Sequence, residues 1–368
     1  RQRQMCIRDS KMIKKECFTA EWIEQVSSEL HYNDKNLIEK VIRALSLLEM
    51  LVKAGCPLVF KGGTALMLIL GKSAHRLSID IDVICPPGTN IEDYLKSFAD
   101  FGFINLELVE RKQRDDADIP KSHSKFFYQI AYRNDTDAQS YILLDVLYED
   151  IHYFRTQQIA INCPFIRLEG KPLMVTVPSA EDILGDKLTA FAPNTTGIPY
   201  YKNGRSCSME IAKQLYDVGR LFENVSDLQI TKEAFRKIAV VELSYRSFGT
   251  DIGQVFNDIR QTALCISTRG KAGEGDFDLI QDGIIRVKSF MYKQRYLIDH
   301  AIIDAARAAY LATLIEKGIN EIESYSNNPA DIKDMVIRPS LPNKLNKLRS
   351  NLPEAYYYWA KTSELLEA

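Results

Sequence analysis

Asp80 and Asp82 are the residues whose type and spacing most directly indicate chemistry, in the stretch Ile79-Asp80-Ile81-Asp82-Val83. Because side chains alternate along a strand, both carboxylates are predicted on one face and the apolar residues on the other. An isolated Asp-x-Asp pair is common and is often a solvated edge strand. Two neighbouring carboxylates repel unless a cation lies between them, and Mg²⁺ binds carboxylates and phosphate oxygens. We therefore predict that this pair holds two Mg²⁺ ions, which can activate an attacking oxygen and stabilise a leaving one.

A phosphate-binding turn is predicted shortly before this pair, at Lys61-Gly62-Gly63-Thr64. The turn follows a short apolar strand and precedes an apolar helix, 65–70. Glycine lets the backbone approach a ligand closely. A helix N-terminus presents free N–H groups and the positive end of its dipole to phosphate. Gly62, Gly63 and Thr64 are therefore predicted to contact phosphate, with the Thr64 hydroxyl as a further donor.

Asp145 is the candidate for a third carboxylate, because it interrupts the apolar strand predicted over 141–148. A buried aspartate is costly unless it is paired, hydrogen-bonded or bound to a metal ion. If this strand lies beside the strand of Asp80 and Asp82, Asp145 can reach the same cation. The alternative is a buried aspartate that backbone N–H groups satisfy.

The elements that must position these residues follow from periodicity and turn signals. Apolar residues at spacings of three and four predict a helix over about 21–54. Strands are predicted at 58–60, 79–84, 126–132 and 141–148, and a polar turn, 134–139, joins the last two as a hairpin. Later helices are predicted at 181–191, 209–222, 279–317 and 353–366. The predicted fold class is α+β, with a small mixed-sheet core followed by a mainly helical C-terminal domain.

Two domains are predicted from the length of 368 residues, with a boundary where the mixed pattern becomes helical. The first, over 12–178, contains all three aspartates, and the helical domain covers 179–368. Residues 1–11 have no apolar segment of the kind found in signal peptides. They are expected to be non-native, with Met12 as the natural start.

The amino-acid composition limits which binding partners and which cellular compartment fit this chain. Hydrophobic residues make up 46% and charged residues 26%, an ordinary globular balance, and the formal net charge is −2. This charge argues against tight coating of a polyanion, although a local basic stripe is enough to bind nucleic acid. No apolar run reaches the length of about 18 residues that a membrane span needs. The seven cysteines include no Cys-x-x-Cys pair, which fits a cytoplasmic protein.

The stretch from Lys61 to Asp82 resembles a known superfamily of enzymes. Lys-Gly-Gly-Thr-Ala-Leu, followed by Arg76-x-Ser78-x-Asp-Ile-Asp, is similar to the motif of DNA polymerase β-like nucleotidyltransferases. Within them the chain is most similar to the AbiEii/AbiGii-type toxins, including MenT-like enzymes, over about residues 35–225. The resemblance implies transfer of a nucleotide from an NTP with two Mg²⁺ ions. It also implies that Lys61, Arg76 and Ser78 belong to the nucleotide site.

The resemblance extends to two later helices. It implies that Lys187 contacts the triphosphate and that Asp217, on the next helix, completes the pocket. Arg205, in the polar loop between them, is a weaker candidate for phosphate or RNA contact. The alternative for Lys187 is a surface lysine on an amphipathic helix. The alternative for Asp217 is a structural salt bridge within the helical domain. His123 is interpreted as an ordinary surface histidine, since nothing else in the sequence supports a phosphate contact.

The identity of the acceptor molecule is implied by the resemblance alone. The toxin branch implies RNA, with a tRNA 3′ end as the expected acceptor, growth arrest or abortive phage infection as the outcome, and a cognate antitoxin encoded nearby. One alternative is transfer to a protein or small-molecule hydroxyl. Another is a nucleotide-binding regulator without turnover, against which the costly set of three carboxylates argues.

Overall fold

The computed structural model describes residues 13–109, 121–133, 138–225, 227–246, 249 and 251–368. The chain forms two compact units. The first unit contains residues up to 179 together with 289–294, and the second contains 180–288 and 295–368. The domains predicted at 12–178 and 179–368 stay a prediction, and the segment 289–294 is the main difference from them. The expectation for residues 1–11 and Met12 lies outside the described residues.

A five-stranded mixed sheet is the framework of the first unit, with strand order β1-β2-β5-β4-β3. The strands are β1 (Val59–Lys61), β2 (Ile81–Cys85), β3 (Asn105–Val109), β4 (Lys121–Gln129) and β5 (Gln139–Tyr148). β2 and β5 are parallel, and the other neighbouring pairs are antiparallel. The fold class is therefore α+β, as predicted, and the hairpin β4–β5 is confirmed.

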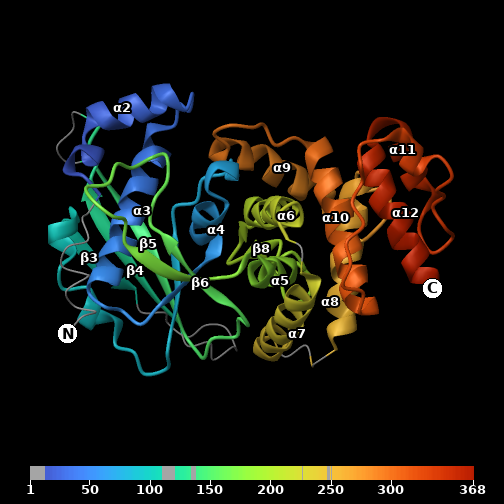
Figure 1. Cartoon of the computed structure of the whole chain (residues 1–368), viewed down its shortest axis with the longest axis horizontal. Helices are drawn as coiled ribbons and strands as arrows, with labels where there is room; N and C mark the ends of the chain where they lie inside the picture. The colour runs from blue at the N-terminus through green and yellow to red at the C-terminus, as the bar shows by residue number, and fades with distance from the viewer. Residues whose placement is uncertain (1–12, 110–120, 134–137, 226, 247–248, 250) are drawn as a thin grey trace. The chain divides into compact units, whose positions relative to one another are not determined.

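Two helices cover the region predicted as one helix over 21–54. These are α2 (Ala20–Glu29) and α3 (Lys35–Lys53), and the single-helix prediction was wrong because Asp34 caps a new N-terminus by accepting from Leu37 N. α3 packs against β2 and β5, and Figure 1 shows it lying across the sheet. Leu45 and Leu48 of α3 and Val83 and Leu144 of the sheet are buried in this core.

The sheet has one buried face and one partly open face because burial alternates along β4 and β5. Phe126 and Tyr128 of β4 and Leu144 of β5 are fully buried. Their strand neighbours, among them Lys125 and Asp145, are less buried and point to the other face. Side chains that can meet a ligand therefore lie on this second face.

Several smaller elements of the first unit had no sequence prediction or were placed inexactly. β6 (Thr156–Ala160) pairs with β7 (Met174–Pro178) in a separate two-stranded sheet. α4 (Gly62–Leu70) follows β1 with no intervening residue. The segment 289–294 returns to this unit, where Leu77 N donates to Phe290 O at 2.8 Å and Tyr292 N donates to His75 O at 3.0 Å.

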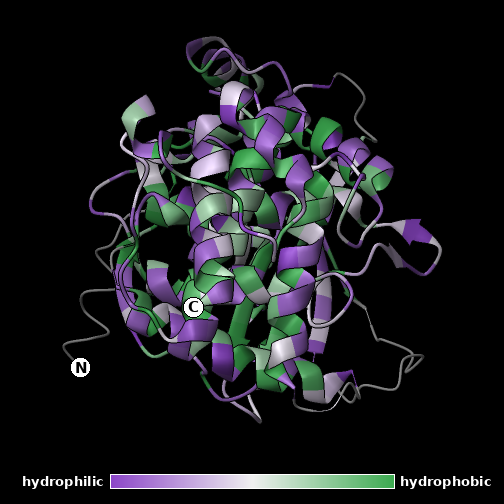
Figure 2. Ribbon diagram, turned by 90° about the vertical axis from the view of Figure 1, so that its right-hand side faces the viewer, coloured by the Kyte–Doolittle hydropathy of each residue, from purple (hydrophilic) through white to green (hydrophobic). Residues whose placement is uncertain are grey.

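The second unit is helical, as predicted for the C-terminal part. Its longer helices are α5 (Ala180–Ala190), α6 (Ser208–Phe222), α7 (Leu228–Tyr245), α8 (Ile252–Ser267), α9 (Phe277–Val287), α10 (Ile298–Lys317) and α12 (Pro353–Glu367). The shorter α11 is Leu348–Asn351. α10 packs against α6, α8 and α12 and is buried along most of its length. Figure 2 shows helices that carry both hydrophobic and hydrophilic residues. The helix predicted over 279–317 is two helices, with the 289–294 segment between them.

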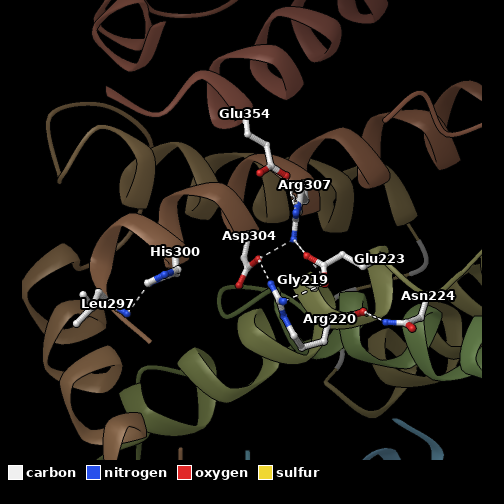
Figure 3. A network of polar contacts seen from close by, with 9 residues as sticks. All are labelled: Gly219, Arg220, Glu223, Asn224, Leu297, His300, Asp304, Arg307 and Glu354. Atoms are coloured by element: carbon white, nitrogen blue, oxygen red, sulfur yellow. Dashed lines mark hydrogen bonds and ion pairs between the residues drawn. The ribbon is translucent and has the colours of Figure 1, made fainter. Parts of the chain in front are cut away.

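Arg307 ties α6, α10 and α12 together inside this unit (Figure 3). Its guanidinium donates to Glu354 Oε1 and to Glu223 Oε1, each at 2.9 Å. It also approaches Asp304 Oδ1 at 3.4 Å. Gly219 lets α6 come this close, since a Cβ there would lie 2.0 Å from Asp304 Oδ1. Aromatic residues of α12 belong to the same core, with Tyr358 and Trp359 buried.

A membrane-spanning helix needs about 20 predominantly apolar residues, and in the described part of the chain no helix meets that requirement.

Candidate active site

Four side chains form a row across the sheet because their residues are paired in register. Lys61 of β1 is paired with Asp82 of β2, Asp82 with Asp145 of β5, and Asp145 with His123 of β4. Directly paired residues present their side chains on the same face, and neighbouring strands are about 4.8 Å apart. The condition that we set for Asp145, a strand beside that of Asp82, is therefore met, and its role as a metal ligand stays a prediction.

The Gly-Gly turn lies against this row and explains why both positions are glycine. Gly62 has φ +79°, and a Cβ there would lie 2.1 Å from Asp82 Oδ2. At Gly63 a Cβ would lie 2.7 Å from Ser78 Oγ and 2.9 Å from Arg76 Nη2. The absence of side chains lets the first turn of α4 approach the carboxylate and the guanidinium closely. Gly62 is thus adjacent in space to Asp82, and Gly63 to Arg76 and Ser78.

Asp80 lies differently from the sequence prediction. β2 begins at Ile81, so Asp80 precedes the strand and the strand's alternation does not fix its side chain. The Thr64 hydroxyl donates instead to Asp80 O at 2.7 Å, and Thr64 is fully buried. Because a hydroxyl has one hydrogen to donate, this bond uses the donor that we had expected to contact phosphate. Thr64 therefore connects α4 to the residue before β2.

α4 keeps the properties of an anion-binding helix terminus. Its N-cap, Lys61, makes no side-chain cap, and its first turn contains no acidic residue. The N–H groups of this turn and the dipole favour negative charge at the end that meets the carboxylate row. Arg76 is buried, and its Nη1 donates to Leu77 O at 3.0 Å. The loop of Arg76 and Ser78 is thus fixed in place beside Gly63.

His123 is more than the ordinary surface histidine that we expected. Its Nδ1 is hydrogen-bonded to Asp145 Oδ1, and its side chain is 17% exposed. A histidine in a predicted strand gives no signal of such a contact, because the contact depends on the register of β4 against β5. None of the sequence motifs contains this residue.

The carboxylates suit Mg²⁺ bound together with a nucleotide. Among the described residues, no three His, Cys, Asp or Glu side chains form a ready-made metal cluster. Mg²⁺ does not need one, since it usually takes one or two carboxylates, several waters and the substrate's phosphate oxygens. Asp82 and Asp145 supply two carboxylates on adjacent strands, and Asp80 lies two residues from Asp82. The donors are hard oxygens throughout, which fits this ion.

Lys187 and Asp217 are brought together in the second unit. Lys187 Nζ of α5 lies 3.0 Å from Asp217 Oδ2 of α6 and donates to Gln214 Oε1 at 2.8 Å. Their side chains are only 9% and 2% exposed. Lys187 is therefore no surface lysine, and the ion pair that we considered for Asp217 is present. Their predicted contact with nucleotide stays a prediction.

Arg205 lies in a small hairpin and not in an irregular loop. β8 (Tyr201–Lys202) pairs with β9 (Arg205–Ser206) across the turn Asn203-Gly204, in which both residues have positive φ. Asn-Gly is the strongest short hairpin signal, and the loop prediction overlooked it. The side chain of Arg205 is exposed, and its predicted contact with phosphate or RNA stays a prediction.

Two solved structures illustrate what the chain is similar to. The crystal structure of JHP933 from Helicobacter pylori has 17% sequence identity, covering 78% of this chain and 92% of that one, with a TM-score of 0.37. MenT4, a nucleotidyltransferase toxin from Mycobacterium tuberculosis, has 13% identity, covering 80% of this chain and 89% of that one, with a TM-score of 0.40. No curated protein sequence matches the chain.

A family model gives the identification. The model described as nucleotidyl transferase AbiEii toxin, type IV toxin–antitoxin system, matches residues 45–329. This range is most of the chain, and it includes the Gly-Gly turn, the three aspartates and the Lys187–Asp217 pair. The chain belongs to the AbiEii family of nucleotidyl transferase toxins, and it is a nucleotidyltransferase.

Proposed function

We propose that this nucleotidyltransferase is a Mg²⁺-dependent toxin that transfers NMP from an NTP to RNA, with the 3′ end of tRNA as acceptor. Blocking that end would arrest growth and would serve a toxin–antitoxin or abortive phage infection system. The family supports an NTP as substrate and a cognate antitoxin as partner. The identity of the acceptor is part of the proposal.

The reaction is an in-line displacement at the α-phosphate. The acceptor hydroxyl oxygen forms a bond to the α-phosphorus, the bond from that phosphorus to the oxygen bridging to the β-phosphate breaks, and pyrophosphate leaves with the bonding electrons. Asp145 accepts the hydroxyl proton. Bound Mg²⁺ would neutralise the phosphate charge and favour deprotonation of the hydroxyl. Asp80 and Asp82 would hold both ions, and Asp145 the ion at the attacking oxygen.

The observation that carries this proposal is the register of β2 and β5 beside the Gly-Gly turn. It pairs Asp82 with Asp145 on one face of the sheet. Gly62 lies so close to Asp82 that a Cβ would touch the carboxylate. A phosphate that the first turn of α4 binds is therefore next to the carboxylates that would hold the metal.

The remaining predicted residues are assigned to the nucleotide. Gly62 and Gly63 bind the β- and γ-phosphates through backbone N–H groups. Lys61 is in register with Asp82, where its charge offsets the negative charge of the row. Arg76 and Ser78 line the turn beside Gly63. Lys187 contacts the triphosphate, Asp217 holds Lys187 in place, and Arg205 contacts phosphate or RNA.

Label transfer tests the proposal. The purified protein would be incubated with Mg²⁺, total tRNA and each α-labelled NTP in turn, beside an Asp80→Ala/Asp82→Ala variant. We expect the wild type to label RNA, and nuclease P1 should release that label as NMP. EDTA should abolish the labelling, and the variant should show none. Labelled protein that resists nuclease but yields to protease would refute the RNA acceptor and indicate a protein hydroxyl instead.

A further inference from the structure

We infer that His123 is a positioning residue for the transfer reaction, and that its ring fixes the orientation of the Asp145 carboxylate toward the metal ion. The inference rests on the proposed metal site at Asp80, Asp82 and Asp145. It goes further by assigning a role to a residue that none of the sequence motifs contains.

The contact between the two residues is built into the sheet. His123 and Asp145 are paired in register in β4 and β5, at one point of an antiparallel ladder that runs from Lys121 to Gln129. The ring Nδ1 is hydrogen-bonded to Asp145 Oδ1. A carboxylate can only accept a hydrogen bond, so Nδ1 carries the hydrogen and donates it. The backbone pairing fixes both ends of this bond, and neither partner needs to be ordered by a ligand.

The rest of the ring has no competing polar contact among the described residues. His123 Nε2 is buried and makes no hydrogen bond to any of them. The bond to Asp145 is therefore the ring's polar contact within that part of the chain. A histidine that only filled the core would be expected on the buried face of β4, with Ser124 and Phe126. His123 lies instead on the face that carries Asp82 and Asp145.

The hydrogen bond from His123 fixes the Asp145 carboxylate in an orientation in which it can bind a cation. With Oδ1 engaged by His123, the carboxylate cannot rotate freely, and Oδ2 remains for a second interaction. Asp82 lies on the opposite side of Asp145 from His123, on the adjacent strand. Residues that hydrogen-bond metal ligands in this way fix ligand orientation, and their loss typically weakens metal binding or activity about 10- to 100-fold.

Two substitutions of nearly the same shape as each other, asparagine and leucine, separate the effect of the hydrogen bond from the effect of losing the ring's volume. Asparagine at 123 places its amide Nδ2 at the same number of bonds from Cβ as the imidazole Nδ1, so His123→Asn keeps a donor. Leucine has the same branched shape without a donor, so His123→Leu removes the bond. Circular dichroism and thermal melting would establish that both variants fold.

The measurement is the binding of Mn²⁺, monitored by the EPR signal of the free ion, in the presence of an NTP with a non-hydrolysable α–β linkage. We expect His123→Leu to bind Mn²⁺ about 10- to 100-fold more weakly than the wild type. His123→Asn should stay within about threefold of the wild type. In an Asp145→Asn background, His123→Leu should cause no further loss, because the residue that it positions no longer binds the ion.

The outcomes distinguish this inference from the proposed metal site. If the wild type binds Mn²⁺ no better than Asp80→Ala/Asp82→Ala, the metal site itself fails and the role of His123 falls with it. If the wild type binds and His123→Leu binds equally well, the site stands and the role of His123 is refuted. Equal losses in the leucine and asparagine variants, or additive losses with Asp145→Asn, would also refute it.

Discussion

At the scale of single residues, the site depends on how closely backbone and carboxylate approach each other. The Gly-Gly turn and the pair Asp80 and Asp82 indicated the chemistry because they lie close together in the sequence. Asp145 was found because an aspartate interrupts an apolar strand. His123 and the true role of the Thr64 hydroxyl could not be predicted. The contact of His123 depends on which residue lies opposite in the folded sheet, and a slip of one residue would turn its side chain to the other face. The Thr64 bond depends on how the first turn of α4 packs against Asp80, the residue before β2.

Gly62→Ala is expected to lower nucleotidyl transfer by about 100-fold, because misplacing a reacting or ligating group by about 1 Å has an effect of that order. The new Cβ would lie 2.1 Å from Asp82 Oδ2 and push the carboxylate away. Gly55→Ala is the matched control, since Gly55 has a similar φ of +76° but a Cβ added there would meet nothing within 4 Å. Steady-state transfer assays on both variants make the comparison. Equal activity in the two would mean that close approach to Asp82 is unimportant.

At the scale of elements, strands that carry an apolar run or clear alternation were predicted, and two more polar strands were not. β2 and the β4–β5 hairpin were recognised from apolar alternation and a polar turn. β3 and β6 were overlooked because Asn-Leu-Glu-Leu-Val and Thr-Gln-Gln-Ile-Ala contain no continuous apolar run, and each strand forms by pairing with a partner. The region predicted as one helix is divided by the Asp34 cap, which the continuous apolar pattern concealed.

The packing of α5 on α6 gives a prediction about Lys187. Lys187→Met removes the ammonium group 3.0 Å from the buried Asp217 carboxylate, and breaking a buried ion pair costs about 3–5 kcal/mol. The double variant Lys187→Met/Asp217→Asn should regain much of that stability, because no charge remains buried there. Transfer should stay low in both variants, since Lys187 is proposed to contact the triphosphate. Chemical denaturation and transfer assays measure the two quantities.

A double variant that recovers both stability and transfer would contradict the nucleotide role of Lys187. The pair would then be a structural ion pair, which is the alternative that the sequence left open. A double variant that recovers stability but not transfer would support a role of Lys187 in the reaction that is separate from its role in folding.

At the scale of the whole molecule, each unit contains a buried acid that resists ionisation. Burial raises the pKa of Glu49 in α3 to about 7 and the pKa of Asp304 in α10 to about 6. Glu49 nevertheless accepts hydrogen bonds from Ile13 N at 3.2 Å.

The sequence predicted an α/β part and a helical part, but not the return of 289–294 to the first unit. That return depends on backbone bonds between segments more than 200 positions apart, such as Leu77 N to Phe290 O.

Glu49 should make the protein less stable as pH rises. A carboxyl whose folded pKa is raised contributes stability that is complete below the unfolded pKa and is lost as pH rises through the folded value. Between pH 5.5 and 8, Glu49 should account for about 2 kcal/mol of lost stability in the wild type. Glu49→Gln should remove this part of the decline, since the amide does not titrate and keeps an acceptor for Ile13 N. Denaturant unfolding at both pH values measures the effect, and parallel declines in the two proteins would contradict it.

The central claim is that the paired carboxylates of β2 and β5 carry out the transfer, and Asp145 tests it most directly. The measurement is the single-turnover rate of NMP transfer at saturating Mg²⁺ for Asp145→Asn and for Asp150→Asn. Asp150 is an exposed aspartate just beyond the same strand, so its substitution controls for the lost charge. We predict a loss of about 100-fold or more for Asp145→Asn, from the removal of a metal ligand and proton acceptor, and an unchanged rate for Asp150→Asn. A wild-type rate in a folded Asp145→Asn protein would contradict the account.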